Sequence, residues 1–228
     1  ITYFTANPAR GLPAHYATIV LLDSKTGALV AVMDGAYITQ IRTAAVSLLA
    51  VRHLATRPVQ RLAVFGCGVQ ARGHVLALGR LLPSLEEVRV WSPHEELPGF
   101  VDEMSAGVRP VVRAAADGED AVRGADLVVT VTSSPVPVVE REWVEQGALV
   151  ISVGACRPDH REIDPALLAS GRLFVDSREA ALAESGDVIQ GISEGRFGPD
   201  HIEAELGEVI AGRPIAGNGG DPVIFKSL

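Results

Sequence analysis

Residues 61–71, with the sequence RLAVFGCGVQA, place an apolar run directly before a Gly-x-Gly-x-x-Ala turn. The pattern is typical of a strand that enters a helix through a dinucleotide-binding turn. Gly66 would make the tight turn, and Gly68 would let backbone N–H groups approach a diphosphate. Val69 and Gln70 would begin the helix, whose positive end would face the phosphates. The alternative is a tight turn that binds nothing, but the strand before it and the helical spacing of leucines after it favour a binding site.

The rest of the chain predicts a doubly wound α/β fold. Strand-like runs occupy residues 61–66, 87–91, 109–112, 127–131, 148–153 and 172–176. Helical or loop segments between them include residues 95–106, 117–124, 164–170 and 178–185. Several of these runs are apolar almost throughout, as expected of parallel strands covered by helices on both faces. Strands that alternate with helices indicate a Rossmann-type sheet.

The first part of the chain has a different hydrophobic pattern. Apolar runs at 17–22 and 28–33 flank a turn-rich segment and predict a β-hairpin. A helical pattern follows over 39–55, with Thr39 as the expected N-cap. The loop at 212–222, rich in Gly and Pro, is where we expect the chain to leave the doubly wound domain.

Composition limits the classes of function. Nearly half of the 228 residues (47%) are hydrophobic, which is enough for a full core, and the net charge of −8 argues against a nucleic-acid surface. Cys67 and Cys156 are the two cysteines, and their contexts look like strand ends rather than a disulfide framework, so we expect a reducing, cytoplasmic compartment. No apolar run is long enough to span a membrane. The histidines show no metal-ligand spacing, so we assign no metal.

Four motifs occur in a characteristic order. They are Arg42-Thr-Ala-Ala45, the turn at 66–71, the segment GACRPDHREID at 154–164, and Phe225-Lys-Ser-Leu228. Together they resemble the ornithine cyclodeaminase/mu-crystallin family, which also includes archaeal-type alanine dehydrogenases and ketimine reductases. The resemblance implies a homodimer that uses NAD(H) or NADP(H).

The resemblance also implies a division into two domains. Residues 1–56, continued by 222–228, would belong to a discontinuous, smaller α+β domain for dimerisation and substrate binding. Residues 57–221 would form the Rossmann NAD(P)-binding domain. Both ends of the sequence read as strand interiors, so we expect the native protein to extend past them. Relatives carry a substrate-site Lys shortly before the point where this sequence starts.

Arg42 is the predicted substrate ligand. A guanidinium can hold a carboxylate through two parallel hydrogen bonds, and the Arg of this motif has that role in the resembling family. Thr43 would add a hydroxyl to the same pocket or to the cofactor phosphate. The alternative for Arg42 is a surface side chain that lies over an Ala-rich helix.

Cys156 decides the subtype within the family. Ornithine cyclodeaminases are expected to have an Asp at the aligned position, and a neutral thiol cannot assist their amine chemistry. We therefore place Cys156 among the catalytic positions as a small, buried side chain beside the nicotinamide rather than as a reactive thiol. Glu162 and Asp164 are expected to cap the helix that follows.

Residues after three other strands are candidate cofactor ligands. Ser92 and His94 follow the strand at 87–91, where neither the acid typical of NAD binding nor the Arg typical of NADP binding is present. These two residues favour NADP(H); the alternative is a solvated turn. The resemblance also assigns four residues to the cofactor site: Thr132, Ser133, Val153 and Lys226. For Lys226, a strand-edge lysine without a ligand is the alternative.

Together these features predict a nicotinamide-dependent reductase. It would transfer hydride to, or in reverse from, the C=N carbon of a small, carboxylated imino or amino acid. The first alternative is a genuine ornithine cyclodeaminase, which Cys156 disfavours. A second is a relative that oxidatively splits an amino-acid conjugate. A third is a non-catalytic, dinucleotide-binding protein of the mu-crystallin type.

Overall fold

A computed structural model describes residues 1–4, 6–215 and 220–228. The chain divides into two compact units, Ile1–Thr43 and Ala44–Leu228. Among the residues described, no helix is both long and apolar enough to cross a membrane.

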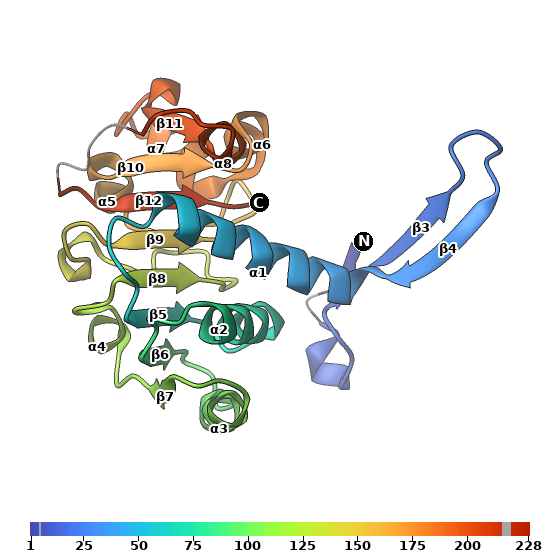
Figure 1. The fold of residues 1–228 in the computed structure, drawn as a ribbon, viewed down its shortest axis with the longest axis horizontal. Helices are drawn as coiled ribbons and strands as arrows, with labels where there is room; N and C mark the ends of the chain where they lie inside the picture. Colours follow the sequence, from blue (N-terminus) through green and yellow to red (C-terminus); the bar gives the residue numbers. More distant parts are fainter. Residues whose placement is uncertain (5, 216–219) are drawn as a thin grey trace. The chain divides into compact units, whose positions relative to one another are not determined.

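Within the described residues, the larger unit is built on a sheet of eight parallel strands (Figure 1). Across the sheet, the order is β11 (Ile202–Glu205), β10 (Arg172–Val175), β12 (Val223–Lys226), β9 (Leu149–Ser152), β8 (Leu127–Thr130), β5 (Arg61–Phe65), β6 (Glu87–Trp91) and β7 (Val111–Ala114). Every residue of β8, β9 and β12 is buried. Burial on both faces explains why the central strands read as nearly continuous apolar runs.

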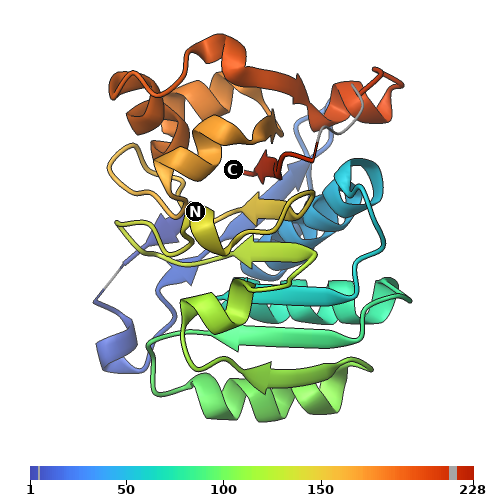
Figure 2. The same cartoon turned by 90° about the vertical axis from the view of Figure 1, so that its left-hand side faces the viewer.

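Helices cover both faces of this sheet (Figure 2). One core cluster joins it to the last turns of α1 (Gly35–Leu54), α2 (Val69–Leu81), α3 (Leu97–Gly107) and α8 (Leu206–Ile210). The other joins it to α4 (Gly118–Val122), α5 (Pro165–Ser170), α6 (Arg178–Glu184) and α7 (Gly186–Ser193). Two short 3₁₀ turns, η2 (Arg141–Trp143) and η3 (Pro199–His201), complete the unit as described. The predicted doubly wound α/β fold is confirmed.

Strand β5 shows how the sequence fills both cores. Leu62 and Val64 belong to one cluster, and Ala63 and Phe65 belong to the other. Successive side chains of a strand point to opposite faces, so both sets are buried.

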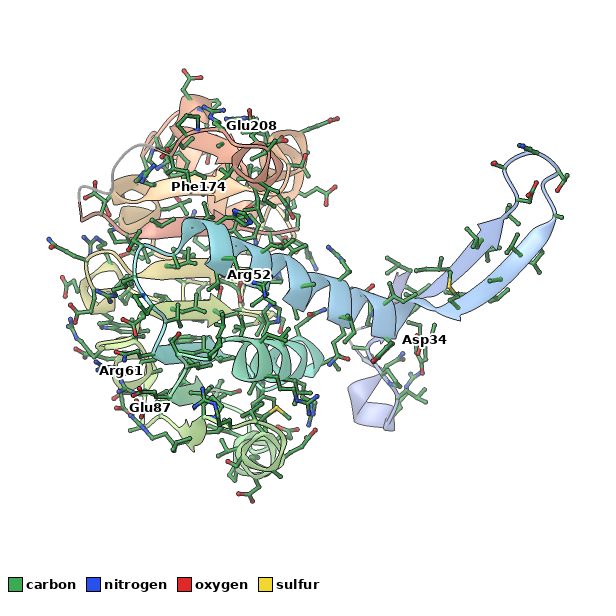
Figure 3. The ribbon with its side chains drawn as sticks, viewed as in Figure 1. Asp34, Arg52, Arg61, Glu87, Phe174 and Glu208 are labelled. Atoms are coloured by element: carbon green, nitrogen blue, oxygen red, sulfur yellow. The ribbon has the colours of Figure 1, made fainter. Side chains whose placement is uncertain are left out.

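The order of the strands reverses beside β5. From β5 the chain continues to β6 and β7 on one side, and it then returns to β8 on the other side. Phe65 and Thr130, the last residues of β5 and β8, are paired in register. In open α/β sheets, ligands bind outside the carboxyl ends of the strands at such a switch point. The amino ends lie at the opposite edge, where Arg61 and Glu87 begin β5 and β6 (Figure 3).

The end of the chain corrects one expectation. Residues 223–226 do not leave the doubly wound unit: as β12 they form an inner strand between β9 and β10. Part of the predicted exit loop, residues 216–219, lies outside the described residues. The division of the compact units falls after Thr43, whereas the predicted domain boundary lies after residue 56. That boundary in the whole protein stays a prediction.

The N-terminal unit contains two small antiparallel sheets in its described part. The first pairs β1 (Thr2–Tyr3) with β2 (His15–Tyr16), with the 3₁₀ turn η1 (Pro8–Arg10) between them. The second is a hairpin of β3 (Thr18–Leu22) and β4 (Leu29–Asp34), which confirms the predicted hairpin. Asp23 orders its turn by accepting hydrogen bonds from the N–H groups of Lys25 and Thr26.

Helix α1 begins earlier than predicted. Its first residue is Gly35, and the Asp34 carboxylate accepts a hydrogen bond from Ala36 N at 2.8 Å, so Asp34 caps the helix. Thr39 therefore lies inside the helix, where its carbonyl accepts a hydrogen bond from the Thr43 hydroxyl at 2.7 Å. The predicted N-cap at Thr39 is wrong because the acid five residues earlier satisfies the first N–H groups.

Candidate functional site

The loop after β5 turns at Gly66. Its φ of 108° is in the region that favours glycine, and an added Cβ would lie 3.0 Å from the Val131 carbonyl oxygen. Gly66 N donates to the Trp91 carbonyl at 2.9 Å, which ties the turn to the end of β6. The glycine is needed both for the backbone conformation and for the close approach of the loop after β8.

The next glycine leaves open space beside the first turn of α2. A Cβ added at Gly68 would meet no described protein atom within 4 Å. Gly68 is the N-cap of α2 and contributes no side-chain cap to it. Ala71, three residues on, is buried against the core. An uncapped first turn beside open space fits the diphosphate of a dinucleotide, because the helix N–H groups there need an acceptor.

Gln70 is polar and incompletely paired inside this turn. Its side-chain oxygen Oε1 is buried and has no hydrogen-bond partner among the described residues. Its backbone carbonyl oxygen lies 2.8 Å from His74 Nδ1, and His74 Nε2 lies 2.9 Å from the Ser47 hydroxyl. Burial lowers the pKa of His74, which favours the neutral ring. Nδ1 therefore donates to the Gln70 carbonyl, and Nε2 accepts from Ser47.

Ser92 and His94 follow β6. The Ser92 hydroxyl is buried, and it accepts from the Cys67 thiol and from His94 N, each at 3.4 Å. Ser92 thus lies beside the glycine turn. His94 is exposed. The acids that follow, Glu95 and Glu96, are exposed as well.

The loops after β8 and β9 approach each other closely. A Cβ on Gly154 would lie 2.1 Å from the Thr132 carbonyl oxygen, so this position requires glycine. Val153 is buried, and its N–H donates to the Thr130 carbonyl at 2.9 Å. Thr132 is half-buried, whereas the neighbouring Ser133 is exposed.

Cys156 stands in the loop after β9. Its thiol donates to the Val153 carbonyl at 3.1 Å, which orients the side chain back toward the strand end. The residue is exposed, so the expectation of a buried side chain is wrong. Asp159, further along the loop, pairs with Arg157 at 3.0 Å.

Lys226 ends β12 and is completely buried. Its Nζ lies 3.8 Å from Asp187 Oδ2 and 3.4 Å from the Ser152 hydroxyl. The side chain is therefore enclosed by the protein, and its place in the cofactor site stays a prediction. The alternative of an edge lysine is wrong, because β12 is an inner strand.

Glu162 is the functional candidate that sequence reasoning missed. Predicted as a helix cap, it is instead fully buried, and its carboxylate accepts from Thr132 N and Gly154 N, both at 2.6 Å. Burial raises the pKa of Glu162, and the nearby Lys226 ammonium opposes that rise. Asp164 does cap α5 as predicted, by accepting from Ala166 N.

Arg42 and Thr43 belong to the N-terminal unit. They lie in the third turn of α1, not in its first turn as predicted from a Thr39 cap. Arg42 is exposed. Among the described residues, no group of three or more His, Cys, Asp or Glu side chains could hold a metal ion.

The doubly wound sheet with a glycine turn at its switch point defines the Rossmann class of α/β proteins. Residues 1–228 match the model of the ornithine cyclodeaminase/mu-crystallin family, and the chain belongs to that family. The resemblance drawn from the four ordered motifs is confirmed.

Similar proteins include enzymes of known reaction. The rat ketimine reductase mu-crystallin is 41% identical over 228 residues, which cover 100% of this chain and 69% of that protein. The solved structure of Thermococcus litoralis Δ1-pyrroline-2-carboxylate reductase, in complex with NADH and L-proline, is 33% identical. It superposes with a TM-score of 0.94 over 99% of this chain and 70% of that chain.

An archaeal alanine dehydrogenase dimer with bound NAD is also 33% identical, with a TM-score of 0.88. The match covers 99% of this chain and 69% of that chain.

Proposed function

We propose that this protein is a nicotinamide-dependent reductase of small, carboxylated imino acids, with cyclic ketimines as the first substrate class to test. The reverse reaction would oxidise the corresponding amino acid. The observation that carries the proposal is the Gly66–Gly68 turn at the switch point, which opens an uncapped helix beside open space. The similar ketimine and pyrroline-2-carboxylate reductases support the reaction type.

Three groups of residues would hold the coenzyme. The backbone at Gly68, Val69 and Gln70 would bind the diphosphate, because no side chain competes for the first N–H groups of α2. Ser92 and His94 would border the adenosine, and Thr132, Ser133 and Val153 would border the nicotinamide. When bound, the nicotinamide supplies the hydride.

The protein's own part is to bind and orient the substrate. Arg42 would hold the substrate carboxylate by two parallel hydrogen bonds, as a guanidinium does with a planar acid. Thr43 has its hydroxyl engaged by the Thr39 carbonyl in this structure, so we assign it a role in the pocket only if that bond is exchanged for one to a ligand.

Cys156 favours reduction over cyclodeamination. The Cys156 side chain donates to the Val153 carbonyl, and a thiol offers no carboxylate to a distal amino group. An ornithine cyclodeaminase remains the second candidate, and formation of proline and ammonia from ornithine tests it.

The choice between NADH and NADPH is a finer question. Ser92 and His94 favour NADP(H) from the sequence, whereas the solved pyrroline-2-carboxylate reductase and alanine dehydrogenase contain NADH and NAD. Titration of the protein with each reduced coenzyme, followed by energy transfer from tryptophan, distinguishes the two. An affinity for NADPH at least about tenfold higher is the outcome that the sequence predicts.

We also propose a homodimer formed through the N-terminal unit. Its hairpin exposes a run of large apolar side chains on both strands: Ile19, Val20, Leu21, Leu22, Leu29, Val30 and Val32. A contiguous exposed apolar surface of this kind marks an interaction site in soluble proteins. The similar alanine dehydrogenase is a dimer. Light scattering of the full-length protein tests the proposal, and Val20→Lys or Val32→Lys should shift the equilibrium toward monomers.

The decisive experiment for the reaction uses the full-length protein. Purified enzyme is mixed with NADH or NADPH and with a panel of cyclic imino acids, or with 2-oxo acids plus ammonia. Oxidation of the coenzyme is followed by its absorbance. Turnover of a cyclic imino acid supports the proposal, and coenzyme binding without turnover of any compound favours the non-catalytic, dinucleotide-binding alternative.

A further inference from the structure

Three neighbouring strands end in polar residues that form one row across the sheet. Thr130 of β8, Ser152 of β9 and Lys226 of β12 are paired in register. All three are completely buried, at 0% exposure, and each is the last residue of an otherwise apolar strand. Because strand side chains alternate between faces, the row lies on the face that carries Val128, Val150 and Ile224.

Two buried acids cover this row. Glu162 accepts from the Thr130 hydroxyl at 2.9 Å, and Asp187, in the first turn of α7, accepts from the Ser152 hydroxyl at 2.9 Å. Lys226 supplies the positive charge, 3.8 Å from Asp187. Buried charges are costly unless they are paired and fully hydrogen-bonded, so a network of this size in a core indicates a specific use.

The network holds the loops that border the candidate site. Glu162 Oε1 accepts from Thr132 N after β8, and Oε2 accepts from Gly154 N after β9. Asp187 in turn accepts from the N–H groups of Glu162 and Ile163, at 2.8 and 3.1 Å. The segment from 154 to 162, which carries Cys156, is thereby fixed at both of its ends.

We propose that Glu162 is a positioning residue for hydride transfer, because one carboxylate clamps the two loops that would border the nicotinamide. The expected effect on kcat rests on the proposed function. The hydrogen bonds by which Glu162 joins the two loops do not depend on it. Glu162 touches neither substrate nor coenzyme in this scheme; it sets the spacing of Thr132 and Gly154. Misplacement of a reacting group by about 1 Å can lower a rate by about two orders of magnitude.

Glu162→Gln tests the clamp with nearly unchanged shape and volume. In either orientation of the amide, its NH2 group faces one of the two backbone N–H donors, so one loop loses its acceptor. We expect kcat per coenzyme-binding site to fall about 10- to 100-fold, with the KM for coenzyme within about threefold of wild type. Counting sites by coenzyme titration removes any unfolded fraction from the comparison.

Hydrogen exchange gives a readout that does not need activity. In the coenzyme-free protein, peptides that contain residues 131–134 and 153–156 should exchange at least about tenfold faster in Glu162→Gln than in wild type. Glu162→Asp keeps the charge but is one methylene shorter, so it should also lose kcat. If Glu162→Gln does not fold, slow exchange of the Thr132 and Gly154 amides in the wild-type protein still supports the clamp, and exchange as fast as in an exposed loop overturns it.

Glu203→Gln is the matched control. Glu203 makes a bidentate pair with Arg172 near the amino ends of β10 and β11, away from the two loops. The same chemical change there should leave kcat and the exchange of both loop peptides unchanged.

Unchanged hydrogen exchange of the loop peptides in Glu162→Gln overturns the proposal. Faster exchange in Glu162→Gln together with a wild-type kcat also overturns it, as does a wild-type kcat in Glu162→Asp. If the wild-type enzyme turns over no imino acid at all, the proposed function fails, while the exchange measurement still decides whether Glu162 clamps the loops.

Discussion

Gly154 and Thr132 lie so close that a Cβ on Gly154 would stand 2.1 Å from the Thr132 carbonyl oxygen. The obstacle is backbone, which cannot rotate away as a side chain would. Gly154→Ala should therefore lower the free energy of unfolding by about 2 kcal/mol or more, as overpacking of a close contact does. Urea denaturation measures the change. A variant as stable as wild type would show that the two loops are further apart than described.

Gly68→Ala should leave the stability unchanged and weaken coenzyme binding. The added Cβ meets no described protein atom within 4 Å, so folding should be unaffected, with Tm within about 2 °C of wild type. The methyl group would occupy the space proposed for the diphosphate, and we expect the Kd for the reduced coenzyme to rise at least about tenfold.

Gly99→Ala is the control for that substitution. Its Cβ also meets nothing within 4 Å, but it lies in α3 rather than in the turn after β5. Its coenzyme affinity should equal that of wild type. Equal affinity in Gly68→Ala as well would mean that the diphosphate binds elsewhere.

The fold could be predicted wherever local sequence decides it. Strand β5 is recognisable as a continuous apolar run because it is buried on both faces. The hairpin turn is recognisable from Asp23, whose side chain accepts hydrogen bonds from the backbone of the turn. Helices α7 and α8 and the edge strand β11 were missed. In β11 apolar and acidic residues alternate, so it lacks the continuous apolar run that marks the inner strands. The position of β12 was also missed, since the order of parallel strands is set by contacts that are distant in sequence.

The candidate site was predictable only in part, for the same reason. The glycine turn is visible as a motif, but the partners of Glu162 come from residues 30 and 8 positions earlier in the chain. A polar residue at the end of each of three apolar strands was the available signal for that network. Cys156 is exposed because the loop after β9 leaves the sheet, which the composition of the loop does not reveal.

Arg42→Ala should separate substrate binding from coenzyme binding. Loss of the guanidinium would remove the bidentate partner proposed for the substrate carboxylate, so KM for a carboxylated imine should rise about 10- to 100-fold. The Kd for coenzyme, measured by fluorescence, should stay unchanged. Arg42→Lys keeps the charge without the planar fork and should give an intermediate KM. Loss of coenzyme binding in Arg42→Ala would show that this residue serves the nucleotide instead.

His74 should make the protein less stable in mild acid. Burial lowers the pKa of His74 in the folded state below the ordinary value of 6.5, so below that pH the unfolded chain binds a proton that the folded chain does not. The contribution of this group to the free energy of unfolding therefore decreases as the pH is lowered, by at most about 1.4 kcal/mol per pH unit.

The comparison with His74→Gln isolates this contribution. Unfolding of wild type and variant is measured between about pH 7.5 and 5.5. The stability advantage of wild type should shrink steadily toward the acid end. A difference that is constant over this range would contradict a neutral, buried imidazole at His74.

The most direct test of the central claim is the rate at which the full-length protein oxidises NADH or NADPH in the presence of Δ1-pyrroline-2-carboxylate, the substrate type of a similar solved reductase. Wild type is compared with Gly68→Ala at equal concentrations of folded protein. We predict turnover by wild type and a lower rate at sub-saturating coenzyme in the variant. Equal rates in the two proteins would contradict a nicotinamide coenzyme held at the turn after β5.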